Sequence, residues 1–424
     1  MSEDPAAAPP LSTAPAESTN WRLIISLALV FFILFALYAA VLNVLLPNQL
    51  QNIDPVRKTA LLGTLFAITS VFSTLSTPIA GALSDRTRTR FGRRTPWIVS
   101  GAVIGGGALI SIPHMQGLIT ITAMWLVACV ALNSLQPAIT AIIAERFPPE
   151  RRGFVSGAVG ASMTAGLSFG AIFGGLLAAQ IGVAYLILGG AIMAVAILFV
   201  IVNPEPIVSA APLPPFRANE FLRSFWISPR AHPDFAWAFA GRFMIYMGYQ
   251  GVVTYLLYIL QDHIGLSQAS ANETIARISF VTFLGLVLSG LLSGWISDVT
   301  GRRKPLVFAA SLVMALALIV PMAAPTTTGM FIYAGLIGLG YGAFMSVDLA
   351  LMTQVLPVRD DNDSETGKDL GILSTAINIP QIISPVLAAA LLDATGKNYN
   401  VLFIAGCLFV VAGAFFVLPI RSVR

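Results

Sequence analysis

The chain carries one pattern twice, as GALSDRTRTRFGRRTP at residues 81–96 and as GWISDVTGRRKP at residues 294–305. In each copy a glycine stands four residues before an aspartate, and a Gly-Arg-Arg triplet and a proline follow. The first copy is longer by four residues. A pattern that recurs at corresponding places indicates an internal duplication. The sequence therefore predicts two related halves.

A second similarity connects segments further along each half. LQPAITAIIAERFP at residues 135–148 aligns with FMSVDLALMTQVLP at residues 344–357. This alignment places Ile139 opposite Asp348 and Pro148 opposite Pro357. Two similarities in the same relative positions strengthen the case for duplication.

The composition indicates that lipid is the medium around most of the chain. Hydrophobic residues make up 56% and charged residues only 10% of the 424 residues, whereas roughly a quarter of the residues in soluble domains are charged. The apolar residues fall into runs of about 20, the length that crosses a hydrocarbon core of about 30 Å. These runs lie at about 22–46, 60–84, 96–113, 118–144, 153–179, 182–202, 235–260, 273–297, 305–323, 329–355, 370–392 and 400–420.

The runs predict an all-α integral membrane protein with twelve transmembrane helices arranged as two pseudo-symmetric six-helix bundles. We expect four parts in the chain. These are a disordered cytoplasmic tail at residues 1–20, an N-terminal bundle at 21–203, a cytoplasmic linker at 204–234 and a C-terminal bundle at 235–424. The linker is too polar and too rich in proline to cross a membrane.

The distribution of Lys and Arg predicts the orientation. Of the 24 basic residues, 19 fall on the side of the two termini and the linker, three on the opposite side, and two inside spans. Cytoplasmic loops collect Lys and Arg. The sequence therefore predicts a multi-pass protein of the cell (inner or plasma) membrane with both termini in the cytoplasm.

The duplicated loop resembles the signature loop of the major facilitator superfamily of secondary transporters, and the resemblance covers the chain from Trp21 onwards. It implies a cytoplasmic gate that holds the two bundles together when the cavity opens outward. Asp85 and Asp298 end helices, where the helix dipole disfavours an anion, so each needs a nearby cation or helix N-terminus. The alternative is that these loops only determine topology. The expected gate residues are Gly81, Asp85, Arg86, Gly92, Arg93, Arg94, Glu145, Gly294, Asp298, Gly301, Arg302 and Arg303.

Two further resemblances point to different substrates. The longer first loop is similar to that of sucrose-type and glycoside-pentoside-hexuronide:cation symporters. The second span, unlike that of the cation symporters, has no acidic residue, which argues against a sodium site of the melibiose-carrier pattern. The fifth span resembles the glycine motif of drug:proton antiporters at Gly157, Gly166, Gly170, Gly174 and Gly175, with Ala171 in place of its proline. Plain helix packing is the alternative explanation of these glycines.

Ionisable residues inside spans are costly, at about 2.5 kcal/mol or more for each charge, and Arg242 and Asp348 are the two clearest of them. Arg242 in the seventh span and Asp348 in the tenth lie at similar depths, roughly 10 to 12 Å from the cytoplasmic end at 1.5 Å per residue, so they can form a salt bridge. By the resemblance, both spans line the central cavity. We expect Asp348 to be the proton-coupling carboxylate, kept ionised by Arg242. A static structural ion pair is the alternative.

Polar and aromatic residues recur at helical spacing on the same faces. Amides and aromatic rings suit a neutral hydroxylated ligand. Each residue by itself is better explained by helix packing, whereas the group as a whole favours a binding site. Tyr38 and Asn43 are weaker candidates. The expected substrate-binding residues are Asn133, Gln136, Arg242, Tyr246, Tyr249, Tyr341, Asn378 and Gln381.

The sequence shows no nucleotide-binding loop, metal-ligand pattern or catalytic nucleophile, so we expect no enzyme activity, no cofactor and no bound metal. The expected partners are a small-molecule substrate, a coupling ion (H⁺) and the lipid bilayer, with no nucleic acid. The predicted function is secondary active transport of a sugar or glycoside by alternating access, coupled to protons. Proton-coupled efflux of drug-like amphipathic compounds is one alternative. A non-transporting membrane sensor on a transporter fold is another.

Overall fold

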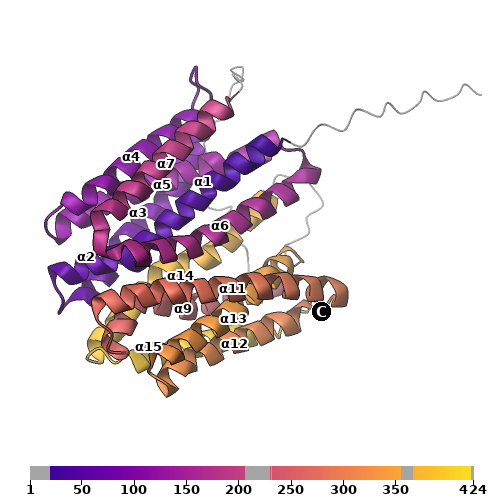
Figure 1. Ribbon diagram of the computed structural model, residues 1–424. Helices are drawn as coiled ribbons and strands as arrows, with labels where there is room; N and C mark the ends of the chain where they lie inside the picture. Colours follow the sequence, from indigo (N-terminus) through magenta and orange to yellow (C-terminus); the bar gives the residue numbers. More distant parts are fainter. Residues whose placement is uncertain (1–19, 206–229, 231, 355–365, 422–424) are drawn as a thin grey trace, which may run out of the picture.

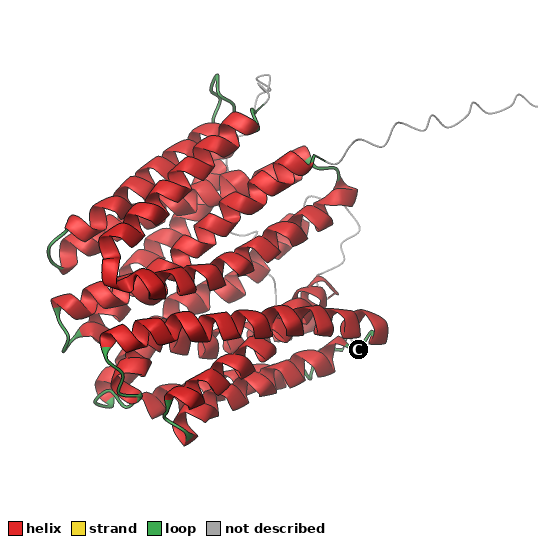
Figure 2. Ribbon diagram, in the orientation of Figure 1, coloured by secondary structure: helices red, strands yellow, loops and turns green. Residues whose placement is uncertain are grey.

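The computed structural model describes residues 20–205, 230, 232–354 and 366–421. Helices account for most of these residues (Figure 2). The first half contains α1 (Trp21–Ala40), η1 (Val41–Leu45), α2 (Leu46–Ile53), α3 (Lys58–Arg86), α4 (Thr95–Ser111), η2 (Ile112–His114), α5 (Leu118–Arg146), α6 (Pro149–Leu177), η3 (Ala178–Gln180) and α7 (Ile181–Val202). The second half contains α9 (Pro233–Thr254), α10 (Leu256–Tyr258), η4 (Ile259–His263), α11 (Gln268–Thr300), α12 (Arg303–Ala323), α13 (Thr327–Gln354), α14 (Thr366–Ala394) and α15 (Tyr399–Phe416).

The described helices provide twelve stretches that can cross a membrane. Ten stretches are long and apolar enough to cross, and eleven if the bent pair Pro233–Thr254 and Leu256–His263 is one span. One of the ten, Arg151–Val202, is 52 residues long and contains both α6 and α7. A single straight helix of that length would measure about 78 Å, far more than a bilayer core. Both helices instead pack on α1 and meet at the turn η3, so this stretch is two spans and the predicted count is confirmed.

The helices pack as two bundles (Figure 1). In the first, α1 packs on α6 and α7, and α5 packs on α3 and α4. In the second, α13 packs on α11 and α12, and α9 packs on α14 and α15. The bundles meet where α3 packs on α14 and where α6 packs on α11. The predicted domain boundaries at residues 203 and 235 lie next to the end of α7 at Val202 and the start of α9 at Pro233.

Small residues explain the close packing inside the first bundle. A Cβ atom added to Gly166 would lie 2.4 Å from the Phe32 carbonyl oxygen, and one added to Gly170 would lie 2.0 Å from the Ala36 carbonyl oxygen. At Gly174 the same atom would approach Ala40 Cα at 3.1 Å. Glycines on α6 therefore let the backbones of α1 and α6 touch, as small residues commonly do in membrane helices.

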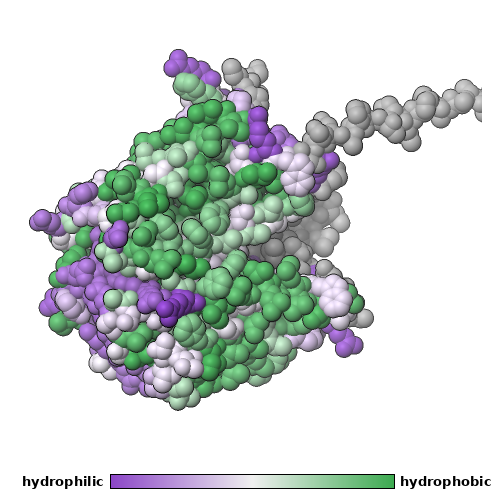
Figure 3. Space-filling model, in the orientation of Figure 1, coloured by the Kyte–Doolittle hydropathy of each residue, from purple (hydrophilic) through white to green (hydrophobic). Residues whose placement is uncertain are grey.

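The exposed surface of both bundles is apolar. Large hydrophobic side chains are exposed on α7 and α11, for example Ile201 at 70%, Leu186 at 56% and Leu291 at 72%. Figure 3 shows hydrophobic residues covering much of the visible face over both bundles, with hydrophilic residues towards the ends. Such a surface is stable against lipid hydrocarbon and not against water.

One π-helical turn lies in the first span of each half. η1 is continued by α2, and η4 ends the bent segment α9–α10. A π turn contains one residue more than the α-helical turn that it replaces, and such turns are frequent at functional sites. α14 has a different irregularity, because Pro380 and Pro385 lie inside the helix.

Candidate functional site

A buried ion pair joins α9 and α13 inside the second bundle. The Nε atom of Arg242 lies 3.1 Å from the Oδ2 atom of Asp348, and the two side chains are only 6% and 4% exposed. Neither of these two atoms has a hydrogen-bond partner among the described residues. The contact is therefore an ion pair without the geometry of a hydrogen bond. The structure brings together the two intramembrane charges that the sequence singled out.

Aromatic side chains lie beside this pair, one and two helical turns along α9 and α13. Tyr249 stacks on Tyr341 with ring centroids 4.5 Å apart and an interplanar angle of 10°. Tyr246 meets Tyr341 edge to face, its hydroxyl lies 3.4 Å from the Tyr341 hydroxyl, and it donates to Met345 Sδ at 2.9 Å. Four of the eight predicted substrate-binding residues, Arg242 and these three tyrosines, thus form one cluster with Asp348.

The other predicted substrate-binding residues lie outside that cluster. Asn133 and Gln136 are half-buried on α5 in the first bundle, where Asn133 Nδ2 donates to the Cys129 carbonyl oxygen at 2.8 Å. Asn378 and Gln381 are exposed on α14, the helix that packs on α3 of the other bundle. The structure therefore divides the predicted site between the two bundles.

Tyr38 on α1 is a weaker candidate from the sequence with a distinctive position. It packs against the core of the first bundle, edge to face with Phe35, and its hydroxyl is buried without a hydrogen-bond partner among the described residues. A buried hydroxyl without a partner is unfavourable unless something else satisfies it. Tyr38 thus offers an unused hydrogen-bond donor inside the first bundle.

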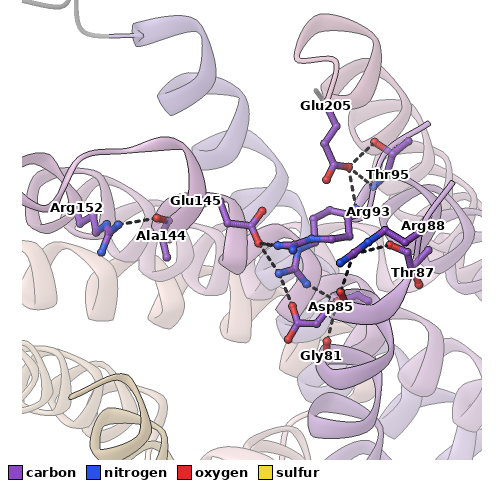
Figure 4. A network of polar contacts seen from close by, with 12 residues as sticks. Gly81, Asp85, Thr87, Arg88, Arg93, Thr95, Ala144, Glu145, Arg152 and Glu205 are labelled. Carbon is purple, nitrogen blue, oxygen red and sulfur yellow. Dashed lines mark hydrogen bonds and ion pairs between the residues drawn. The ribbon is translucent and has the colours of Figure 1, made fainter. Parts of the chain in front are cut away.

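The first signature loop forms an ionic cluster, shown in Figure 4. Arg94 contacts Asp85 Oδ1 and Glu145 Oε1, each at 2.5 Å, and Arg93 also pairs with Glu145. Arg94 further donates to Ser84 Oγ at 2.6 Å. These residues belong to α3, α5 and the loop before α4, all in the first bundle. In this conformation the cluster braces one bundle internally.

The charge state of Arg94 follows from these contacts. Its side chain is only 5% exposed. Burial lowers the pKa of Arg94, but the hydrogen bonds and ion pairs with Glu145 and Asp85 outweigh it, so the pKa is raised above the ordinary value. Arg94 is thus a permanent cation between two carboxylates, as the predicted gate requires.

Glu205 completes the cluster, and sequence reasoning missed it. Its Oε2 atom accepts hydrogen bonds from the backbone N–H groups of Arg94 at 2.8 Å and Thr95 at 3.1 Å. These N–H groups open α4, where a carboxylate is stabilised by the helix dipole. Gly92 makes room for this carboxylate, because a Cβ atom there would lie 2.3 Å from Glu205 Oε2. The start of the predicted linker is therefore attached to the first signature loop.

The second signature loop repeats part of this arrangement. Gly301 ends α11 with a φ of 65°, a left-handed conformation that favours glycine at a helix C-terminus. Arg302 precedes α12, Arg303 begins it, and Asp298 lies near the end of α11. The predicted gate residue Arg86 ends α3, the helix that corresponds to α11 in the first half.

The glycines of the two loops face equivalent positions. A Cβ atom on Gly81 would lie 3.7 Å from Pro137 Cβ, and one on Gly294 would lie 2.8 Å from Ser346 Oγ. Pro137 and Ser346 are opposite one another in the alignment that pairs Ile139 with Asp348. The same internal contact thus occurs in both halves, which supports the duplication. Within the described residues, no group of three His, Cys, Asp or Glu side chains is arranged to hold a metal ion.

Comparison with known proteins agrees with this geometry. The sequence matches the Major Facilitator Superfamily over residues 41–360 and 274–424. The chain belongs to the Major Facilitator Superfamily, and it is a membrane transporter and not an enzyme.

Curated relatives carry several transport functions. The multi-drug resistance efflux pump PmrA of Streptococcus pneumoniae is 24% identical over 307 residues, which cover 70% of this chain and 71% of the pump. An uncharacterized symporter of Synechocystis is 48% identical over only 44 residues, 10% of this chain and 8% of that protein. The fujikurins efflux protein of Gibberella fujikuroi is 27% identical over 192 residues, 44% of this chain and 38% of that protein.

Solved structures share the fold. A bacterial homolog of the human lysosomal transporter Spinster, in an inward-facing and unoccupied conformation, has a TM-score of 0.69 with 16% identity, and the match covers 94% of this chain and 95% of that chain. The D-xylose-proton symporter has a TM-score of 0.64 with 16% identity, covering 95% of this chain and 98% of that chain. At this level of identity the likeness shows the fold alone.

Proposed function

We propose that this transporter moves a small hydroxylated solute, a sugar or glycoside, across the cell membrane by alternating access with proton coupling. The substrate would bind between the bundles, against the tyrosine cluster of α9 and α13 and the amide side chains Asn133, Gln136, Asn378 and Gln381. Asp348 carries the coupling proton and Arg242 is its counter-ion.

The buried Arg242–Asp348 pair is the observation that carries this proposal. A buried carboxylate in an ion pair without hydrogen-bond geometry is a poor structural brace, because burying two charges costs more when their hydrogen-bonding atoms are left unpaired. The same arrangement suits a carboxylate that must change charge, since separation from the arginine favours its neutral form. Intramembrane ionisable residues commonly mark proton relays.

Three observations support a sugar as the substrate. The stacked Tyr249 and Tyr341 rings offer an apolar face, on which the C–H face of a sugar can pack. Asn133 and Gln136 are half-buried amides, and Tyr38 has an unused hydroxyl donor. The first signature loop is similar to that of sugar symporters. A neutral polyhydroxylated ligand uses both apolar contact and paired donors and acceptors.

Efflux of an amphipathic compound is the second candidate, and it rests on the efflux relatives. Four of the five motif glycines do not add to it, because Gly166, Gly170 and Gly174 are accounted for by contact with α1 and Gly175 by contact with α11. A non-transporting sensor is the third candidate. It gives no role to the buried Arg242–Asp348 pair, which a sensor would not need to keep.

The conformation is inward-facing if the termini are cytoplasmic, as the basic residues predict. The hydrogen bonds and ion pair that join the bundles gather at the end with α2 and η4, and α6 and α11 diverge towards the end where the chain terminates (Figure 1). In the outward-facing state the gate residues of the two signature loops, together with Glu145 at the end of α5, would bring the bundles together at the opposite end.

A transport assay with an Asp348→Asn variant tests the proposal. Purified protein in proteoliposomes is assayed for counterflow of radiolabelled sugars and drugs, and for uphill uptake with and without an imposed pH gradient. We expect the variant to lose uphill uptake of the accepted substrate while it keeps counterflow, because exchange requires no net proton movement. Uphill uptake with unchanged proton dependence would remove Asp348 from the mechanism.

Two controls keep this test decisive. Asp348→Asn leaves the buried Arg242 unpaired, which is strongly destabilising, so the double variant with Arg242→Gln removes both charges together. If the double variant also keeps counterflow without uphill uptake, the loss comes from coupling and not from misfolding. Glu273→Gln, at an exposed pair on α11, should leave both activities unchanged.

A further inference from the structure

An ion pair connects the two bundles at the end opposite to the signature loops. Lys58 begins α3 in the first bundle, and Asp262 lies in η4 of the second. The Lys58 Nζ atom is 2.7 Å from Asp262 Oδ1, and the two side chains are 6% and 29% exposed. This is a contact across the bundle interface that involves a nearly buried cation.

The second bundle supplies every described partner of the Lys58 ammonium. Gln261 Oε1 accepts from it at 3.1 Å, and the Tyr258 ring lies 4.7 Å below it, within range of a cation–π contact. Asp262 in turn accepts from the Tyr399 hydroxyl at 2.8 Å through its other oxygen. The Lys58 ammonium therefore belongs to the first bundle, and the groups that stabilise it belong to the second.

Amide side chains form a second connection at the same end. Asn48 on α2 and Asn272 on α11 exchange two hydrogen bonds of 2.8 and 3.1 Å. Gln268 donates to Asn48 at 2.7 Å and to Asn52 at 3.3 Å. Because Asn48 and Asn272 are buried, separation of the bundles must replace these bonds with water. We call Asn48, Lys58, Gln261, Asp262, Gln268 and Asn272 the inter-bundle cluster.

The backbones approach closely around this cluster. A Cβ atom on Gly63 would lie 2.4 Å from Ala389 Cβ of α14. A Cβ atom on Gly175 would lie 2.6 Å from the Asn272 carbonyl oxygen of α11. Tight packing across the interface thus lies on both sides of the polar cluster, and only 6% of the Lys58 side chain is exposed.

The two π turns help to determine where the polar residues of the inter-bundle cluster lie. η4 contains Gln261 and Asp262, and Asn48 follows η1 within the first turn of α2. Each π turn shifts the residues beyond it relative to a regular helix. The corresponding spans of both halves therefore use the same irregularity to direct polar side chains towards the opposite bundle.

We propose that the Lys58–Asp262 pair is a gate that closes the transport pathway at this end and sets the balance between the two open states. The inference rests on the alternating access proposed above. It assigns a gating role to residues outside both signature loops and outside the Arg242–Asp348 site. Opening at this end separates the pair and exposes both charges to water, so the strength of the pair determines how often the end opens.

The environment of the pair predicts an asymmetry between its two partners. Asp262→Asn leaves Lys58 buried without a counter-ion, and an unpaired buried charge strongly disfavours the closed state. Lys58→Met leaves Asp262, which is partly exposed and still bonded to Tyr399, so less is lost. Asp262→Asn should therefore favour opening more than Lys58→Met does. The double variant with Lys58→Met and Asp262→Asn should open about as often as Lys58→Met alone, because it contains no buried ammonium.

Distance measurements between spin labels test this gate without substrate or proton gradient. One label pair at Val56 and Thr395 reports on the closed end, and one pair at Phe91 and Thr300 reports on the opposite end, with all four side chains exposed. Cys129 and Cys407 are first replaced by alanine. The full chain is reconstituted in lipid nanodiscs, and the two distance distributions are recorded by double electron–electron resonance.

We expect Asp262→Asn to raise the long-distance fraction at the Val56–Thr395 pair about tenfold and Lys58→Met about threefold. The distances at the Phe91–Thr300 pair should shorten in the same samples. The charge-exchanged variant, with Lys58→Asp and Asp262→Lys together, should return the distributions towards wild type. Glu273→Gln, which breaks an exposed pair inside α11 alone, is the matched control and should change neither.

The proposal would be overturned if wild type and Asp262→Asn gave equal distance distributions. It would also be overturned if the charge-exchanged variant kept the shift seen in the single variants. A larger shift for Lys58→Met than for Asp262→Asn would also contradict it. The result is independent of coupling at Asp348. If Asp348→Asn still concentrates substrate but Asp262→Asn opens this end, the proposed proton site fails and the gate stands.

Discussion

Gly92 shows how one residue determines the shape of the first signature loop. Its φ of 100° is a conformation that side chains rarely adopt, and its missing Cβ leaves the space that Glu205 occupies. We expect Gly92→Ala to destabilise the protein by the cost of the strained backbone, about 1 to 3 kcal/mol. It should further weaken the contact of Glu205 with the start of α4. Thermal unfolding of the detergent-solubilised protein measures the two destabilising effects together.

Gly117 supplies the matched control for this prediction. Its φ is 92°, but nothing lies within 4 Å of a Cβ atom built there. Gly117→Ala therefore has the backbone cost without the loss of Glu205. If the two variants unfold at the same temperature, Glu205 contributes nothing to the stability of the loop.

Part of the candidate site could be predicted at the level of single residues. Counting along the spans gave Arg242 and Asp348 similar depths, which permitted their contact, and the family resemblance placed both spans beside the cavity. Glu205 and Lys58 could not be found this way. Glu205 is a carboxylate in a proline-rich segment, where most charges are solvated, and the partner of Lys58 lies 204 residues further along the chain. Neither the rotation of a helix nor its neighbours can be read from hydropathy.

The packing of α6 on α1 depends on glycine at particular positions of α6. A methyl group on Gly170 would lie 2.0 Å from a backbone oxygen of α1, where no flexible side chain can move away. We expect Gly170→Ala to force the helices apart and to cost about 1 to 3 kcal/mol, as overpacking does. A lower unfolding temperature together with unchanged substrate preference would fit a purely structural role.

Gly157 on the same helix is the control for that substitution. Nothing lies within 4 Å of a Cβ atom at this position, so Gly157→Ala should unfold at or above the wild-type temperature because alanine favours helix. An altered substrate profile at full stability in Gly170→Ala would instead favour the efflux interpretation of the glycines.

Sequence predicted the helices better than it predicted their ends. The apolar runs correctly gave twelve spans, because each span must bury a full set of side chains in lipid. The first span was expected to end near residue 46, yet helix continues to Ile53. Asn48, Gln49 and Asn52 made this stretch look like a loop, whereas the structure buries Asn48 and Gln49. The π turns were not predicted, since one extra residue in a turn leaves hydropathy unchanged.

At the scale of the whole molecule, the orientation predicted by the basic residues can be measured directly. In a variant without native cysteines, we expect Arg57→Cys to react with a membrane-impermeant maleimide added to intact cells. Phe91→Cys should react only after permeabilisation, because it lies in the Arg-rich first signature loop. Both side chains are exposed, at the start of α3 and between α3 and α4.

The reverse labelling pattern would place the termini outside. It would also turn the conformation described here into an outward-facing one, and the inter-bundle cluster would then close the cytoplasmic end. Reaction of both cysteines in intact cells would show that the assay does not distinguish the two sides.

The duplicated architecture could be predicted, but the conformation of the transporter, open at one end or at the other, could not. Two copies of one loop were enough to indicate two related bundles, and the contacts of Gly81 and Gly294 show that the relation extends to individual residues. The end at which the bundles meet depends on small differences in free energy between alternative arrangements of the two bundles. One sequence encodes every state of the cycle, so hydropathy and motif spacing do not indicate which state prevails.

The two prolines inside α14 have a consequence for movement. Proline has no backbone N–H, so Pro380 and Pro385 each remove one rung from the hydrogen-bond ladder in the middle of this helix. A helix interrupted in this way bends at lower cost than a helix whose hydrogen-bond ladder is complete. α14 forms the wall against α3, and it can act as a hinge that absorbs strain while the interiors of the bundles keep their packing.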